Sequence, residues 1–405
     1  MTTLPTPARE RKPTNPWLIF ILICVPIFIG SVDLTAIVVV LPQATLELMG
    51  PKGLDQADQA LWAVTAYLLA YTLSLALLGR LSDVISRKKI FIVCNAIFVL
   101  GAIWTGLTTG LPLTLLRMLP IWPEPDMLPL ISLVIGRVIQ AIGAGASVSV
   151  GMALVSDLFP VEQRAEPISL IGALDSLGWV VGNLFAGLLL QVLTSWQAFF
   201  LIQAAIAGVV LVFTFAALQR APEGIISGRF DWRGAFIFSA ALIAMTIGVE
   251  ALKAPSLEAY LLLGISGLLV VGFGVLQLRT PNALFDMQFI RRPVVRDALL
   301  TNVLVGFGLI LMVAGVPLII NLRSVFLRGE GLLTGALRAG VTLCALTVPL
   351  IVPLDAADCP SAREEHKSTA RPAVHLIQAR ISMCDLRWPF PILCLSNHGG
   401  TEKTP

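Results

Sequence analysis

Long apolar runs recur through the first 354 residues, and they constrain the fold more than any other feature of this chain. Helices need about 20 apolar residues to cross roughly 30 Å of hydrocarbon. Lipid offers no hydrogen-bond partner to the backbone, so each run is expected to be a helix. The sequence therefore predicts an all-α polytopic membrane protein. Its candidate spans are 17–41, 60–79, 90–110, 129–157, 167–190, 198–218, 234–252, 260–278, 298–321 and 338–354.

The composition excludes a water-soluble globule. Of the 405 residues, 56% are hydrophobic and only 13% are charged, whereas about 25% of the residues of an average soluble protein are charged. The net charge of +3 is small and the basic residues are dispersed, which argues against nucleic acid as a partner. The predicted partners are the lipid bilayer and a small-molecule cargo, since many spans joined by short loops indicate a carrier or a channel.

Residue sets that bind metals or perform catalysis are missing from the apolar region. All three histidines, His366, His375 and His398, follow residue 354, so we expect no histidine-ligated metal or haem among the spans. No Ser-His-Asp set and no phosphate-binding glycine loop occurs there. We therefore expect a protein that is not an enzyme and that holds neither a metal nor a cofactor.

The basic residues predict the orientation in the membrane. If the N-terminus is cytoplasmic, the inner segments hold 15 Lys and Arg residues and the outer segments hold five. The inner segments are 1–16, 80–89, 158–166, 219–233 and 279–297, and the outer ones are 42–59, 110–128, 191–197, 253–259 and 322–337. That asymmetry satisfies the positive-inside rule. The first run follows Arg9, Arg11 and Lys12 and is about 25 residues long, longer than the apolar part of a signal peptide. It is expected to remain as a span behind a cytoplasmic tail, 1–16.

Residues 355–405 differ in character from the spans. They mix Pro, Cys, His and charged residues without a helical or strand period, so a non-membrane, disordered tail is expected. Two interpretations stay open. The segment is either a cytosolic regulatory tail or the product of a truncated or frame-shifted reading frame whose true continuation would be more membrane helices.

Polar residues within the spans are the candidates for a transport site. Ionisable side chains in hydrocarbon cost about 2.5–3.5 kcal/mol on insertion scales, so they are functional candidates by default. Asp33 in the first span and Arg137 in the fourth each lie about 12 Å from the outer end, which permits an ion pair. Gln140 is three residues after Arg137 and faces the same side. Asp175, about 12 Å from the inner end of the fifth span, is a second acid.

Each of these charges has a structural alternative. A carboxylate beside a guanidinium stays ionised until cargo or a conformational change alters the pairing, and a proton is then exchanged. Alternatively, Asp33 and Arg137 form a structural pair that only joins two helices. For Asp175 the alternative is a residue that faces water in the inner vestibule.

Two further patterns concern packing and the loop after the second span. Gly178 and Gly182 are four residues apart in the fifth span, and such small residues let two helices approach closely. The segment 80–89 is expected to be a ten-residue hinge loop between two helices, and its basic cluster also fits a simple topogenic signal.

These motifs resemble those of the major facilitator superfamily, and within it the fourteen-span drug:proton antiporters of the EmrB/QacA type. The family signature G-x-L-x-D-x-x-G-R-K is similar to residues 79–88, matched at Gly79, Asp83, Arg87 and Lys88, with Ser86 where glycine is usual. The first-span acidic motif resembles 33–42, and the fourth-span R-x-x-Q-G-x-G motif resembles 137–143. Residues 229–234 resemble the linker that introduces two extra central helices.

The resemblance covers residues 15–354 and implies a major facilitator fold. A six-helix N-terminal bundle would occupy 17–218, and a linker with two central helices would occupy 219–278. A partial C-terminal bundle of two helices, 279–354, would leave that half of the fold incomplete. By the same resemblance Asp33 and Arg137 would serve proton coupling and cargo response, and Asp83 with Arg87 would govern an inner gate.

The implied function is proton-coupled efflux of small amphipathic organic compounds across the plasma membrane, with the proton gradient as the energy source. The fifth-span motif G-P-x-x-G-G reads Gly-Trp-Val-Val-Gly-Asn at 178–183, so antiport and other forms of coupling both stay open. The alternative class is a non-transporting remnant or a membrane-embedded interaction protein that relies on an accessory subunit, because alternating access needs two halves.

Overall fold

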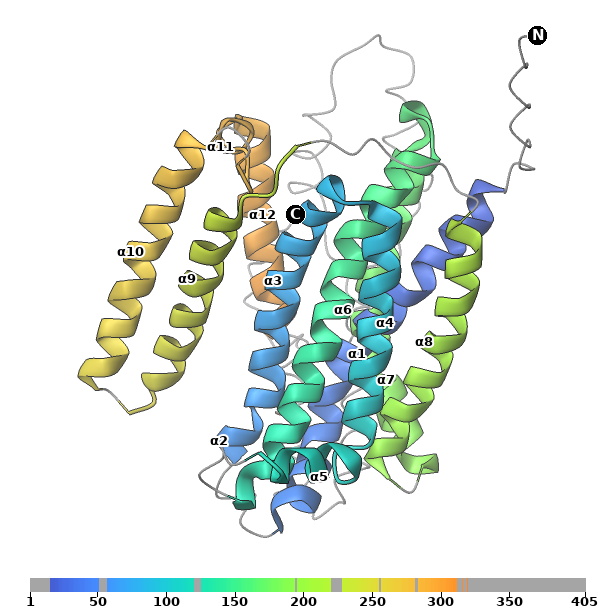
Figure 1. Cartoon of the computed structure of the whole chain (residues 1–405), viewed down its shortest axis with the longest axis vertical. Coiled ribbons are helices and arrows are strands. Elements are labelled where there is room, and N and C mark those ends of the chain that lie inside the picture. The colour runs from blue at the N-terminus through green and yellow to red at the C-terminus, as the bar shows by residue number, and fades with distance from the viewer. Residues whose placement is uncertain are drawn as a thin grey trace, which may run out of the picture. The chain divides into compact units, whose positions relative to one another are not determined.

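The computed structural model describes residues 15–50, 57–119, 125–193, 195–219, 228–254, 256–280 and 283–311, together with 315 and 319. These residues are helical and include no β-strand, which confirms the predicted all-α class for this part of the chain (Figure 1). The chain divides into two units, Met1–Val352 and Pro353–Pro405, and every described residue belongs to the first. The predicted span 338–354 and the tail 355–405 lie outside the described residues.

Within the described ranges, eight helices are long and apolar enough to cross a membrane. Each overlaps one of the first eight predicted spans. They are α1 (Pro16–Met49), α3 (Trp62–Val84), α4 (Arg87–Gly106), α6 (Leu128–Leu158), α7 (Ala165–Val192), α8 (Trp196–Leu218), α9 (Trp232–Ala251) and α10 (Leu257–Arg279).

Shorter helical elements lie between these spans, and one more helix follows them. The run predicted at 298–321 overlaps α12 (Pro293–Ile310), which is not among the eight helices that meet the criteria for a span. The short elements are α2 (Ala57–Ala60), α5 (Leu111–Arg117), α11 (Met287–Ile290), η2 (Pro125–Met127) and η3 (Val161–Gln163).

The first span is longer than the sequence predicted. Helix α1 has 34 residues, or about 51 Å at 1.5 Å per residue. The side chain of Asn15 caps its start by accepting a hydrogen bond from the amide of Trp17 at 3.0 Å. Gly50, with a positive φ of 63°, follows its last residue. Asp33 therefore lies halfway along this helix, farther from its C-terminal end than the predicted span implied.

The segment 80–89 is not the hinge loop that the sequence predicted. Helix α3 runs to Val84 and α4 begins at Arg87, so only Ile85 and Ser86 join them. The amide of Ile85 still donates to the Leu81 carbonyl at 3.0 Å, which continues the helical pattern to the junction. Charged side chains at a helix end reach water along their own length, so they do not end the helix.

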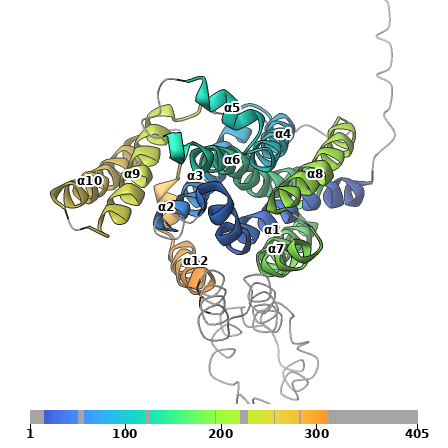
Figure 2. The ribbon, with the colours of Figure 1, turned by 90° about the horizontal axis from the view of Figure 1, so that it is seen from below.

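Helix α6 lies between α3 and α4 and also contacts α1 (Figure 2). Glycines set the distance between α4 and α6. A Cβ atom on Gly143 would lie 2.5 Å from the Phe98 amide nitrogen, and one on Gly101 would lie 2.7 Å from the Gln140 Cα. Only glycine fits at such backbone contacts, so these positions bring the two helices together.

Two apolar clusters pack the bundle on either side of the midpoint of α1. The first includes Ile23, Phe91 and Leu154 and reaches Leu34 on α1. The second begins at Ala36 on the same helix. Polar groups near residue 33 therefore lie between two apolar layers, where electrostatic interactions are strong and an unpaired polar group is costly.

Helices α9 and α10 pack against each other, and α9 also contacts α3. Asp231 caps α9, since its Oδ1 accepts from the Gly234 amide at 2.9 Å. Its Oδ2 accepts from Gln277 Nε2 at 2.8 Å, and Gln277 Oε1 accepts from the Phe285 amide at 3.1 Å. One linker residue thus joins the start of α9, the end of α10 and the segment before α11.

Candidate functional site

Asp33 of α1 and Arg137 of α6 form an ion pair inside the bundle. Arg137 NH1 donates to Asp33 Oδ2 at 2.7 Å and to Oδ1 at 2.8 Å. NH2 also donates to the backbone carbonyl of Asp33 at 3.3 Å. Both side chains are 0% exposed. The two charges that the sequence singled out therefore lie in direct contact.

Gln140 and Gln203 complete the polar group around this pair. Gln140 lies one turn after Arg137 on α6, and its Oε1 accepts from Arg137 NH1 at 2.9 Å. Its Nε2 donates to Asp33 Oδ1 at 2.9 Å and to Gln203 Oε1 at 3.3 Å. Gln203 belongs to α8, and its Nε2 donates to the Ile29 carbonyl at 3.2 Å. The group thus joins three spans, α1, α6 and α8.

Aromatic rings enclose the guanidinium. Its Cζ lies 4.0 Å from the centre of the Tyr67 ring and 5.6 Å from that of Phe200. Tyr67 stacks on Tyr71 of the same helix, with ring centres 6.2 Å apart. Such contacts attract a desolvated cation through the ring quadrupole. One donor of Arg137, Nε, has no hydrogen-bond partner within the described ranges.

The arrangement makes the charge state of Asp33 decisive. Removing a charge from water costs several kcal/mol, and the paired charge and the amides offset that cost only while both partners are ionised. A proton taken up by Asp33 removes its negative charge and leaves Arg137 as an unpaired buried cation. A rearrangement of α1 against α6 that depends on protonation is therefore the chemistry that this geometry allows.

Asp175 lies apart from this pair, on α7, and contacts a different residue of α1. Its Oδ1 is 2.5 Å from the hydroxyl oxygen of Ser31, which is also 2.8 Å from the Ile27 carbonyl. Ser31 itself is buried, with 1% of its surface exposed. On α1, Asp33 and the Ser31 that Asp175 contacts are thus two residues apart, and the two acids have separate partners.

The two glycines of α7 lie against α1. A Cβ atom on Gly178 would lie 2.6 Å from Ser31 Cβ, and one on Gly182 would lie 2.5 Å from the Val32 carbonyl oxygen. These approaches bring Asp175, one turn before Gly178, within reach of Ser31. Close packing of α1 on α7 and the position of the second acid therefore have the same cause.

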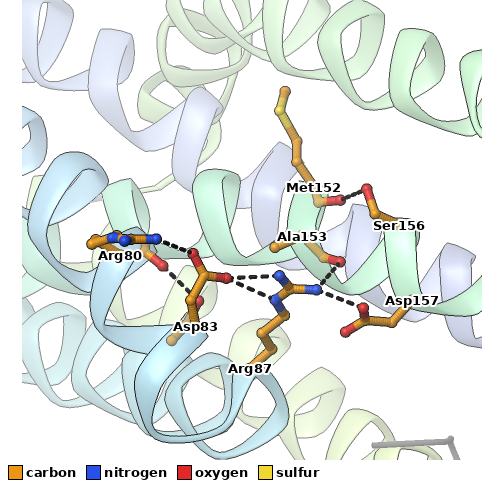
Figure 3. A network of polar contacts seen from close by, with 9 residues as sticks. Arg80, Asp83, Arg87, Met152, Ala153, Ser156 and Asp157 are labelled. Carbon is orange, nitrogen blue, oxygen red and sulfur yellow. Dashed lines mark hydrogen bonds and ion pairs between the residues drawn. The ribbon is translucent and has the colours of Figure 1, made fainter. Parts of the chain in front are cut away.

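The motif at 79–88 forms a charge network where α3 ends and α4 begins (Figure 3). Asp83 Oδ1 accepts from Arg87 NH2 at 2.7 Å and from its Nε at 3.0 Å. Arg80 NH1 lies 3.5 Å from Asp83 Oδ2. Arg87 NH1 donates to Asp157 Oδ1 at 2.5 Å, which joins the network to α6.

The other motif residues lie on the same two helices. Gly79 is in the last part of α3, where a Cβ atom would lie 2.8 Å from the Ser149 hydroxyl of α6. Lys88 is the second residue of α4. The described residues contain no cluster of three His, Cys, Asp or Glu side chains able to hold a metal ion. The three histidines lie outside the described ranges.

Three partners in these networks were missed from the sequence, namely Gln203, Ser31 and Asp157. A lone amide or hydroxyl in an apolar run gives a weak signal, because membrane helices tolerate both. Asp157 ends the predicted fourth span, where a charged side chain is expected simply to reach water. Its pairing with Arg87 depends on the crossing of α4 and α6, which hydropathy does not describe.

Comparison with known proteins adds a family and a fold. The sequence profile of the Major Facilitator Superfamily matches residues 23–354. The MFS efflux transporter aclA of Aspergillus oryzae is 30% identical over 237 residues, 57% of this chain and 38% of that protein. A triacylglyceride transporter of Mycobacteroides abscessus is 29% identical over 316 residues, 76% of this chain and 55% of that protein.

The chain therefore spans between 38% and 55% of the length of these two relatives. Among solved structures, the crystal structure of the POT family transporter PepTSo covers 89% of this chain and 72% of that chain. The TM-score is 0.52 at 14% sequence identity, so this likeness concerns the fold alone.

Proposed function

This chain belongs to the major facilitator superfamily, and from that premise we propose that it is a proton-coupled secondary transporter. Its cargo is a small amphipathic organic compound, which it exports across the plasma membrane. The proton gradient supplies the energy, so the cycle needs no cofactor. One relative bears the name of an efflux transporter and another that of a triacylglyceride transporter, which supports export of an apolar or amphipathic cargo.

The observation that carries the proposal is the fully buried contact of Asp33 with Arg137. Charged side chains inside a membrane are costly and mark ion or substrate pathways more often than structural joints. Here both charges lie halfway through the bundle, between two apolar clusters, and they connect α1 with α6. A carboxylate so placed couples a change of protonation to a change of helix packing.

The proposed cycle couples the ion pair in the middle of the bundle to the charge network at the ends of α3, α4 and α6. A proton on Asp33 weakens its hold on Arg137 and allows α1 and α6 to move relative to each other. Asp175, which contacts Ser31 of α1, is a second carboxylate that responds to the cargo in this proposal. The network of Asp83, Arg87 and Asp157 holds the inner ends of α3, α4 and α6 closed until that movement separates them. The basic asymmetry of the loops supports a cytoplasmic N-terminus for this cycle.

The test is the variant Asp33→Asn, whose amide keeps the shape of the carboxylate and does not titrate. Inverted membrane vesicles that contain the full chain are mixed with external ethidium or with an external neutral fluorescent amphiphile as the probe. We expect the parent chain to accumulate one of them only while a pH gradient is present, and Asp33→Asn to lose that dependence. Asp175→Asn is expected to slow accumulation and to keep the dependence.

Asp297→Asn is the matched control, because Asp297 is 67% exposed and lies on α12, away from the pair. It should behave as the parent does. An unchanged dependence on the pH gradient in Asp33→Asn would show that Asp33 does not couple protons to cargo. Failure of the parent to move either probe against its gradient would count against transport itself.

A further inference from the structure

A polar cavity of about 530 Å³ lies away from the ion pair, at one end of the central helices. Its charged lining comes from three elements: Arg80 near the end of α3, Arg279 at the end of α10, and Asp286 with Arg291 on either side of α11. In Figure 1 the end of α3, the end of α10 and α11 all lie on the side where α1 begins. That side is the cytoplasmic one in the predicted orientation.

The cavity is positively charged and its cations are poorly compensated. Among the described residues that line the cavity, Asp286 is the one acid, and its Oδ1 already accepts from the amides of Gln288 at 2.9 Å and Phe289 at 3.3 Å. The side chains of Arg279 and Arg291 form no ion pair with any residue in the described part of the chain. Two guanidinium groups thus remain available to an anion.

An apolar stripe leads from the cavity along α10. Leu278 lines the cavity and is itself 53% exposed. Val275, Val271 and Leu268 follow at intervals of three and four residues, with exposed fractions of 45%, 65% and 73%. Residues at this spacing share one face of a helix. Only 17% of the apolar window of α10 is buried, so this face is open to the chain of a lipid.

We propose that the cavity binds the phosphate of an anionic phospholipid in the cytoplasmic leaflet. Arg279 and Arg291 hold the phosphate oxygens, for which the planar guanidinium offers paired donors. An acyl chain of the same lipid lies on the stripe from Leu278 to Leu268. A free phosphate shares the headgroup chemistry and lacks the second contact, so the stripe selects the lipid.

The site also reaches the inner charge network. Arg80 lines the cavity and is at the same time 3.5 Å from Asp83, with 37% of its side chain exposed. A bound phosphate competes with Asp83 for this arginine. Asp83 then relies on Arg87, its other partner at 2.7 Å. Lipid bound at the central helices therefore acts on the contacts that hold α3 to α4 and α6.

The experiment measures lipid retained by the purified full chain in a neutral detergent by native mass spectrometry. Phosphatidylglycerol, phosphatidylcholine and glycerol phosphate are added in separate series. We expect tight retention of phosphatidylglycerol alone. Arg279→Gln with Arg291→Gln should weaken it about 30-fold, because each arginine beside an anionic lipid contributes roughly a fivefold gain in affinity. The single variant Arg291→Gln should weaken it about fivefold.

The matched control is Arg292→Gln with Arg296→Gln, which removes the same charge from neighbouring positions outside the cavity lining. It should retain phosphatidylglycerol as the parent does, and melting temperatures establish that all variants are folded. Equal losses in both double variants would overturn the proposal in favour of diffuse surface charge. Equal binding of phosphatidylcholine would overturn the role of charge, and equal binding of glycerol phosphate would overturn the role of the lipid chain.

Discussion

Arg137 is a guanidinium with no access to solvent in an otherwise apolar bundle. The carboxylate of Asp33, the amide of Gln140 and the ring of Tyr67 replace the interactions that water would supply. Each partner is useful only while the others are present, since a lone buried charge has nothing to offset its desolvation. At the scale of residues, the site is therefore a unit whose members respond to substitution together.

Arg137→Leu is expected to destabilise the protein strongly. The substitution leaves Asp33 as an uncompensated buried charge, and breaking a buried pair costs about 3–5 kcal/mol. The measurement is the melting temperature of the full chain in detergent, with unfolding detected by intrinsic fluorescence. Gln203→Leu, which leaves the ion pair intact, should cost only about 1 kcal/mol.

A second substitution sharpens this test. In Asp33→Asn with Arg137→Leu neither charge remains, so the double variant should melt at a higher temperature than Arg137→Leu alone. If the stability loss in the double variant equalled the sum of the losses in the two single variants, burial of an unpaired charge would not be what sets the cost.

Helix α7 has a glycine in tight contact with α1 at one position and a glycine beside open space at another. Gly182 of α7 lies against the backbone of α1 near Val32, whereas a Cβ atom on Gly172 of the same helix meets nothing within 4 Å. A methyl group would therefore clash at Gly182 and would fit at Gly172 of the same helix. At the scale of elements, position within the contact decides what a glycine does.

Gly182→Ala should destabilise the protein by about 1–3 kcal/mol, because the new methyl group forces α1 and α7 apart. Gly172→Ala is the matched control and should have the opposite sign, stabilising by about 0.5–1 kcal/mol through helix propensity alone. Melting temperatures of the two variants in the same detergent check both expectations. Shifts of the same sign would show that α7 does not pack as described.

The contact between α4 and α6 makes a related prediction. Arg87 and Asp157 form a half-buried pair, with 23% and 17% of their side chains exposed. Asp157→Asn should lower the free energy of unfolding by about 1 kcal/mol. This loss is smaller than that from breaking a fully buried pair, because Asp83 still holds Arg87 and solvent screens the contact.

The matched substitution is Ser156→Ala, since the hydroxyl of Ser156 donates to the Met152 carbonyl of its own helix at 3.1 Å and has no other partner in the described part of the chain (Figure 3). It should leave the melting temperature nearly unchanged. A double-mutant cycle of Arg87→Gln and Asp157→Asn should then give a stabilising coupling energy between the two side chains. This coupling energy should be smaller in 1 M salt. A coupling of zero would mean that the pair does not join the two helices.

At the scale of the whole molecule, the basic residues of the loops predict the orientation of the chain in the membrane. Val294, at the start of α12, is 80% exposed and lies in the segment 279–297 that is predicted to be cytoplasmic. Leu111, at the start of α5, is 68% exposed and lies in the segment 110–128 that is predicted to face outward. The two positions are equally suited to chemical labelling, so they report on orientation and not on accessibility.

In a background without native cysteines, Leu111→Cys should react with an impermeant maleimide in intact cells. Val294→Cys should react only after the membrane is permeabilised. Both expectations follow from the excess of basic residues on the inner side. The reverse pattern of labelling would show that the N-terminus faces outward.

The sequence alone was enough to determine the class of protein, the position of eight spans, and the two charges that meet inside the bundle. Hydropathy and residue type are local properties, and the cost of burying apolar or charged groups in lipid acts on each segment separately. Asp33 and Arg137 were identifiable for this reason. A charged side chain in an apolar span is costly unless it has a partner.

Only the tertiary structure decided which helix faces meet. The position of Gln203 beside Gln140, of Ser31 beside Asp175 and of Asp157 beside Arg87 depends on the crossing of helices far apart in the chain. The cavity between α3, α10 and α11 arises in the same way. Helix crossing results from many packing contacts between whole faces, whereas a hydropathy pattern describes one segment at a time.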